Sequence, residues 1–128
     1  MTTETAETAW AHLPNAKHID AVLADARKRP GAWDAARTTA RIAPWDAAWD
    51  AAWTAAWTAA RDAAWDAAWG AARDAARDAI AALIAWDSSA DLLECTPDVL
   101  RAMIDLAEPP VRHQAALLLP SAIVRFGQ

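Results

Sequence analysis

The chain of 128 residues has one cysteine, three glycines, one phenylalanine and no tyrosine. With Cys95 alone, no disulfide can form within the chain, so the fold must depend on packing. Three glycines leave little material for the tight turns that bind phosphates and dinucleotides. Apart from tryptophan, the aromatic and β-branched residues that favour strands are few and scattered. These shortages predict an all-α fold.

Positive charge is also scarce, since 12 lysines and arginines face 17 acidic residues and give a net charge of −5. A protein that binds the nucleic-acid backbone needs a basic face, so this balance argues against nucleic acid as a partner. Asp or Arg interrupts every long apolar stretch, and the sequence therefore predicts no membrane contact through a spanning segment. The N-terminus has neither the basic start nor the apolar run of a secretory signal. We therefore expect a cytoplasmic protein.

Catalytic and metal-binding motifs are missing as well. The three histidines are His12, His18 and His113, and His18 points away from Asp20 on a helix, which makes that pair a poor ligand set. The sequence contains none of the spacings HExxH, CxxC, GxSxG or GxGxxG, and no phosphate-binding loop. We predict a protein that is not an enzyme, with no catalytic residues, no cofactor and no bound metal.

Tryptophan and alanine are abundant instead, and they form a four-residue repeat. From Trp45 to Ala76 the chain reads WDAA WDAA WTAA WTAA RDAA WDAA WGAA RDAA. Alanine is the best helix former, and Pro44 suits the first turn of a helix. The pattern predicts one long central helix over about 44–86. A break near Ala59–Asp62 or at Gly70 stays open.

The repeat distributes its large residues around the helix. Each step of four residues advances about 40° beyond a full turn, so the tryptophan stripe winds around the axis. Packing explains such a winding stripe best, and an exposed subset of tryptophans at a protein interface is the main alternative. Arg61, Arg73 and Arg77 replace tryptophan where the stripe is expected to emerge into water. Together with Asp46 and Asp50, these arginines are our candidate interaction surface.

The remaining segments predict shorter helices around the long one in a single helical domain over 1–128. Trp10 and Leu13 are expected to anchor an otherwise partly disordered N-terminus, and Pro120 should kink or split the last helix. Thr96-Pro97 is a strong helix start, with a capping hydroxyl before a proline. The expected order is a partly disordered segment over 1–14, two short helices over 15–43, the repeat helix over 44–86 and C-terminal helices over 87–128.

The second half of the chain resembles a known family. The run ALIAWD that ends at Asp87, the segment Leu92-Leu93-Glu94, the helix start at Pro97 and the run LLLPS that ends at Ser121 carry the likeness. They resemble a family of alanine-rich, all-helical proteins that are assigned an immunity role in bacterial polymorphic toxin systems and have relatives in bacteriophages. The resemblance covers about residues 45–124. It implies a non-enzymatic function and carries over no catalytic residue.

The sequence therefore predicts a non-enzymatic, all-helical interaction protein that binds and inhibits or neutralises another protein, whose identity the sequence does not give. The role would be immunity-like, or that of a phage protein that modulates its host. We also expect a homodimer formed along the long helix. The alternative from another class is a nucleic-acid-associated or DNA-mimicking acidic protein.

Overall fold

The computed structural model describes residues 9–40, 45–72 and 74–127. Within these ranges every regular element is a helix, which confirms the predicted all-α fold. The elements in chain order are α1 (Ala16–Lys28), α2 (Pro30–Ala40), α3 (Trp45–Thr58), α4 (Asp62–Ala71), α5 (Asp74–Ala85), the 3-10 helix η2 (Asp87–Leu92), α6 (Pro97–Leu106) and α7 (Val111–Phe126).

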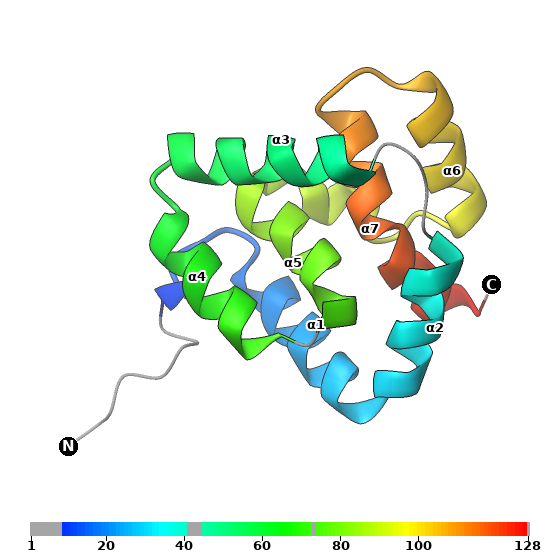
Figure 1. Ribbon diagram of the computed structural model, residues 1–128, viewed down its shortest axis with the longest axis horizontal. Coiled ribbons are helices and arrows are strands. Elements are labelled where there is room, and N and C mark those ends of the chain that lie inside the picture. The colour runs from blue at the N-terminus through cyan, green and yellow to red at the C-terminus, as the bar shows by residue number, and fades with distance from the viewer. Residues whose placement is uncertain (1–8, 41–44, 73, 128) are drawn as a thin grey trace.

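Helices α5 and α7 occupy the centre of the bundle, and the other helices surround them (Figure 1). In α5 the side chains from Ala79 to Ala85 are buried on all sides of the helix. In α7 the same holds from Gln114 to Pro120. Because alanine makes up much of α5, its neighbours α1, α3 and α7 can approach closely. The centre is therefore built on small residues, and bulk is supplied from the surrounding helices.

The Ala/Trp repeat does not form the single long helix that we expected over 44–86. It folds into three helices, α3, α4 and α5. The first turn lies at Ala60, which adopts a positive φ of 59°, and there the N–H of Arg61 donates to the carbonyl of Ala56 at 2.8 Å. The second lies at Ala72, whose backbone is extended (φ −94°, ψ 146°). Gly70 lies inside α4, so glycine does not mark a break.

The physical reason for these turns is the length of the repeat. A straight helix of about 40 residues reaches about 60 Å, roughly twice the width of a domain of this size. By turning twice, the repeat places the alanine sides of α3 and α4 against α5. The gain in burial outweighs the helix propensity of the alanines at the turns. The homodimer expected along the long helix stays a prediction, although the repeat is divided into three helices.

The N-terminal segment is anchored as the sequence predicted. Trp10 and Leu13 are buried, and the indole Nε1 of Trp10 donates to Oδ1 of Asp20 at 2.9 Å. Residues 1–8 of the segment expected to be partly disordered lie outside the described residues. The buried side chain of Asn15 does not cap α1. Its Nδ2 donates instead to the carbonyls of Leu83 and Trp86 at 3.0 and 3.1 Å, which ties the start of α1 to the end of α5.

The C-terminal helices confirm one prediction from the sequence and differ from another. Thr96 caps α6, because its Oγ1 accepts from the N–H of Val99 at 3.4 Å. The expected split of the last helix at Pro120 is not found, since α7 continues from Val111 to Phe126 through that proline. Pro120 has no N–H for the carbonyl of Ala116, four residues earlier. That carbonyl accepts instead from Nε1 of Trp45 at 3.3 Å.

Candidate functional site

The tryptophans of α3 turn step by step from the core into solvent. Trp45 is 7% exposed, Trp53 is 52% exposed and Trp57 is 59% exposed, with Trp49 half-buried between them. Each four-residue step rotates the side chain by about 40°, as the repeat predicts for a regular helix. The rest of the buried side of α3 is alanine: Ala48, Ala52 and Ala56. The tryptophan stripe thus passes from the core to the surface within the length of α3.

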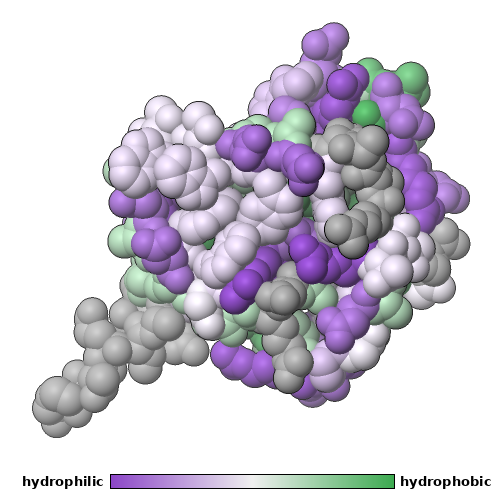
Figure 2. All heavy atoms as spheres, in the orientation of Figure 1, coloured by the Kyte–Doolittle hydropathy of each residue, from purple (hydrophilic) through white to green (hydrophobic). Residues whose placement is uncertain are grey.

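The two outermost rings form what we call the exposed tryptophan pair, Trp53 and Trp57. Their centroids are 5.4 Å apart and their planes differ by 9°, so the rings are stacked. The pale area over α3 and α4 in Figure 2 shows that weakly polar residues gather on this face of the molecule. Contiguous exposed apolar side chains are typical of interaction sites, and tryptophan is enriched among the residues that dominate binding at interfaces.

Carboxylates surround the exposed tryptophan pair. Asp62 and Asp66 lie on the first turns of α4 and are exposed. Together with both rings of the pair they line a hollow of about 120 Å³, whose other walls are Ala56 and Trp65. Asp50, also exposed, lies one turn before Trp53 on α3. The pair is therefore an aromatic surface with negative charge at its edges.

The inner tryptophans of the repeat pack against one another. Trp49 meets Trp65 and Trp69 edge-on, at centroid distances of 5.9 and 4.8 Å. Trp65 and Trp69 are stacked at 5.8 Å with an angle of 19° between their planes. Edge-to-face and offset-stacked contacts are the favourable arrangements of aromatic rings. These three rings therefore join α3 to α4.

A larger hollow opens between α2, α3, α4 and α5. Its volume is about 630 Å³. We call it the tryptophan hollow. Its lining consists of four indoles, two guanidinium groups and one carboxylate: Trp49, Trp53, Trp65, Trp69, Arg37, Arg77 and Asp50.

Both arginines of the tryptophan hollow are held over indole rings. The guanidinium carbon of Arg77 lies 4.8 Å from the ring centroid of Trp69, and its Nε donates to the Trp69 carbonyl at 3.1 Å. The guanidinium carbon of Arg37 lies 5.1 Å from the ring centroid of Trp45. Such cation–π contacts fix the direction of a flexible side chain. The hollow therefore presents its positive charges in defined positions.

A buried carboxylate, Asp78, lies behind this lining. Its side chain has no solvent exposure, and its Oδ2 is 3.5 Å from Nε of Arg37. Burial raises the pKa of Asp78 to about 7, although the charge of Arg37 and the indole of Trp49 act in the opposite direction. Among the described residues, neither carboxylate oxygen has a partner close and well aligned enough for a hydrogen bond. Asp78 and Arg37 thus form a poorly satisfied ion pair in which the carboxylate is fully buried and the guanidinium is partly exposed.

The residues predicted as the interaction surface do not come together at one place. Asp46 and Asp50 are exposed on α3, and Asp50 and Arg77 line the same hollow. Arg73 lies outside the described residues. The guanidinium of Arg61 is occupied in a structural network.

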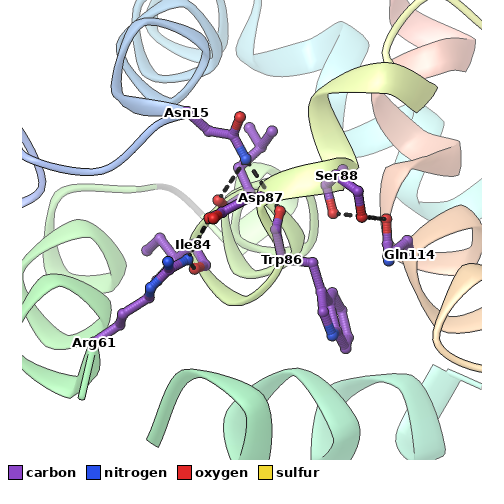
Figure 3. A network of polar contacts seen from close by, with 9 residues as sticks. Asn15, Arg61, Ile84, Trp86, Asp87, Ser88 and Gln114 are labelled. Carbon is purple, nitrogen blue, oxygen red and sulfur yellow. Dashed lines mark hydrogen bonds and ion pairs between the residues drawn. The ribbon is translucent and has the colours of Figure 1, made fainter. Parts of the chain in front are cut away.

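Arg61 connects the start of α4 to the end of α5. Its Nη1 donates to the carbonyl of Ile84 at 2.9 Å and to Oδ1 of Asp87 at 2.7 Å, as Figure 3 shows. Its side chain is only 19% exposed. The arginine that replaces tryptophan here therefore stabilises the fold where the repeat turns back, and a partner would find little of it to contact.

Sequence reasoning left an exposed subset of tryptophans open as an alternative without identifying Trp53 and Trp57, and it missed the pair formed by Arg37 and Asp78. The signal for the tryptophans was present, because the rotation of about 40° per step carries Trp57 far from Trp45 once α3 is taken as a separate helix. No signal in the sequence links Arg37 to Asp78, since the contact depends on how α2 packs against α5.

Other chemistry is sparse in the described ranges. His12 and His18 are exposed, and partial burial and the nearby charge of Arg112 lower the pKa of His113. No group of three or more His, Cys, Asp or Glu side chains there could hold a metal ion. No helix in that part of the chain is long and apolar enough to cross a membrane.

Comparison with protein-family models, curated proteins and solved structures finds no match.

Proposed function

We propose that the protein is a non-enzymatic interaction protein that binds and inhibits or neutralises another protein through the exposed tryptophan pair. The observation that carries this proposal is the stacking of Trp53 and Trp57 at the surface, with both rings more than half exposed. Tryptophan is one of the residues enriched among the side chains that dominate binding energy at protein interfaces. Two such rings, already ordered by stacking, lose little conformational entropy when a partner covers them.

The carboxylates around the pair define the chemistry of the partner. Asp50, Asp62 and Asp66 are exposed beside the rings, so a partner that presents arginine or lysine meets opposite charge and an aromatic face together. The protein's own Arg77 adopts this arrangement over Trp69 at 4.8 Å. An arginine of the partner over Trp57 would repeat that geometry between chains.

An immunity-like role, or a role in a phage protein that modulates its host, fits this chemistry. Neutralising a toxin or a host protein requires coverage of a surface on which that protein depends, and an acidic aromatic patch suits a basic surface of this kind. The resemblance of residues 45–124 to immunity proteins supports the same reading. The net charge of −5 supports it too, because it steers the chain towards basic partners.

A second copy of this chain is a poorer occupant of the same patch. A two-fold contact through the pair would bring the carboxylates of one copy against those of the other, and like charges at an interface cost affinity. Light scattering of the wild type and of Trp57→Ala tests this alternative. A dimer that dissociates in Trp57→Ala would show that self-association, and not a partner, covers the patch.

The proposal is tested by capture from a lysate of the source cells with three baits: the wild type, Trp57→Ala and Leu106→Ala. Leu106 is 83% exposed on α6 and serves as a matched apolar control. We expect a basic protein that the wild type and Leu106→Ala retain and Trp57→Ala does not. The same protein should then bind the purified wild type at least about tenfold more tightly than Trp57→Ala, a difference of about 1.4 kcal/mol.

Nuclease treatment of the lysate separates the protein partner from the nucleic-acid alternative. Retention of the partner after the treatment supports the proposal. If every captured protein is lost after nuclease treatment, or if Trp57→Ala retains the same proteins as the wild type, the proposal is wrong.

A further inference from the structure

The tryptophan hollow is a second possible site, separate in its chemistry from the exposed tryptophan pair. Its volume of about 630 Å³ falls in the range of pockets that take small molecules, roughly 300–1,000 Å³. Its walls come from four different helices, and its indoles and guanidinium groups contact neighbouring aromatic rings. A rigid concave surface of this kind binds a ligand without a large ordering cost.

The walls favour a flat, aromatic ligand. Trp53 stacks one face on Trp57, which leaves its opposite face available, and it lines the tryptophan hollow as well. Trp49 and Trp69 are half-buried at the same hollow, so parts of their rings are accessible. Aromatic rings gain from stacking or edge contacts beyond the burial of their area. A planar ring system therefore gains more here than an aliphatic group of equal size.

The charges favour an anion. The lining carries two guanidinium groups, from Arg37 and Arg77, against one exposed carboxylate, from Asp50. Guanidinium groups that are fixed in place bind carboxylate and phosphate strongly and with defined geometry. The contacts of Arg77 with Trp69 hold it in position at the wall.

The ion pair behind the wall points the same way. Nε of Arg37 lies 3.5 Å from Asp78 without forming a hydrogen bond, and both carboxylate oxygens are similarly unsatisfied. Burial of the carboxylate in this state costs stability. Because burial raises the pKa of Asp78 to about 7, part of its charge is already neutralised near neutral pH. Arg37, whose side chain is 39% exposed, therefore keeps positive charge to offer to a ligand.

We propose that the tryptophan hollow binds a planar aromatic compound that carries a carboxylate or phosphate group, with the ring against Trp53 and the anion at Arg37. A cationic ligand, such as an alkylated ammonium held by the indoles, fits the tryptophan hollow less well than an anion. Such a cation would meet both guanidinium groups, and Asp78, which has no solvent exposure, cannot reach it. Nothing in this inference depends on the protein partner.

Three indole derivatives that differ only in charge test the proposal directly: indole-3-acetate, the neutral indole-3-acetamide and the cationic tryptamine. The measurement is a titration of the full chain followed through the indole N–H signals in two-dimensional NMR. We expect indole-3-acetate to bind at least about tenfold more tightly than the other two. The signals of Trp49 and Trp69 should shift. Those of Trp10 and Trp33, whose indole N–H groups donate hydrogen bonds to Asp20 and Asp25, should not shift.

A nucleotide pair separates the two possible anions. Adenosine monophosphate and adenosine share a ring and differ in the phosphate group. Tighter binding of the monophosphate than of indole-3-acetate identifies a phosphate-bearing ligand, and the reverse order identifies a carboxylate-bearing one. Either order supports the proposal, provided that the anion of each set binds more tightly than its neutral analogue.

A pair of variants isolates Arg37. Asp78→Asn removes the buried charge and keeps the guanidinium, while the double variant Arg37→Met/Asp78→Asn removes both groups and leaves no unpaired charge in the core. We expect Asp78→Asn to bind the preferred anion and the double variant to bind it at least about tenfold more weakly. Leu106→Ala, on α6 and outside the lining, should bind it like the wild type. The unchanged signals of Trp10 and Trp33 report that each variant is folded.

Two results would overturn the inference. The first is tighter binding of tryptamine than of indole-3-acetate, which would assign the hollow to a cation. The second is equal affinity of Asp78→Asn and the double variant for the anion, which would remove Arg37 from the site. Neither result affects the proposed protein partner, whose test depends on Trp57.

Discussion

The indole nitrogen of Trp45 donates to the carbonyl of Ala116 at 3.3 Å. Ala116 lies four residues before Pro120, so its carbonyl has lost the donor that an ordinary helix would supply. A side chain from α3 therefore satisfies the backbone group that the proline leaves open in α7. This contact explains how a helix buried at the centre of the bundle runs through a proline.

The contact predicts an interaction between two substitutions. Trp45→Phe removes the donor and should lower the free energy of unfolding by about 1–3 kcal/mol, because the Ala116 carbonyl is then buried without a partner. In a Pro120→Ala background the N–H of residue 120 can bond to that carbonyl. The cost of Trp45→Phe should then fall by about 1 kcal/mol or more. Urea unfolding of the four proteins in the cycle measures this difference, and equal costs in the two backgrounds would show that Trp45 does not serve this role.

Ala60→Gly tests the turn that divides the repeat. Ala60 has a φ of 59°, a conformation that costs an L-residue about 1–2 kcal/mol and glycine very little. We expect the substitution to raise the free energy of unfolding by several tenths of a kcal/mol or more, less the added flexibility of the unfolded chain. If the repeat were one continuous helix, glycine would instead lower stability by about 1 kcal/mol. The sign of the change, measured by thermal or urea unfolding, decides between the two structures.

Asp78 should make stability depend on pH. Its pKa is raised from 3.8 to about 7 in the folded protein, so the folded state binds the proton more tightly than the unfolded chain. The resulting stabilisation is complete below about pH 4 and is lost as the pH rises through about 7, and it amounts to a few kcal/mol. Relative to Asp78→Asn, the wild type should therefore lose stability between pH 5 and pH 8. A pH-independent difference between the two proteins would contradict the raised pKa.

Arg61 and Arg29 form a matched pair of arginines in different surroundings. Arg61 is 19% exposed and bonds both Ile84 and Asp87, so Arg61→Ala should cost on the order of 1–3 kcal/mol. Arg29 is 50% exposed and pairs with Asp25 one turn away, a type of contact worth about 0.5 kcal/mol or less. Equal costs for the two variants in urea unfolding would show that Arg61 does not hold the end of α5.

The sequence predicts much of the fold through local signals. The helix start at Thr96 and the anchoring of Trp10 follow from capping chemistry and from the size of an indole, and both are found. The turns at Ala60 and Ala72 could not be predicted, because alanine has the highest helix propensity and carries no stop signal. They exist because packing around α5 outweighs local preference, and that balance is a property of the whole chain.

The candidate site was likewise predictable only in part. The rotation of the stripe along α3 is a consequence of a four-residue period and was predictable. The candidate interaction surface stays a prediction, and the contacts of its arginines, Arg61 with Ile84 and Asp87 and Arg77 with Trp69, were not predictable from the sequence. Long arginine side chains reach partners that only tertiary structure brings close. The contact of Arg37 with Asp78 is of the same kind.

The tryptophans of α3 divide into a core residue, Trp45, a half-buried residue, Trp49, and an exposed pair, and we predict that the exposed pair is not needed for folding. The most direct test compares the free energies of unfolding of Trp45→Ala and Trp57→Ala in urea. We predict a loss of about 3–5 kcal/mol for Trp45→Ala, because removal of a buried indole leaves a cavity. We predict a loss below about 1.5 kcal/mol for Trp57→Ala, since only a surface stacking contact is removed. Comparable losses in the two variants would contradict this prediction, because Trp57 would then be part of the core.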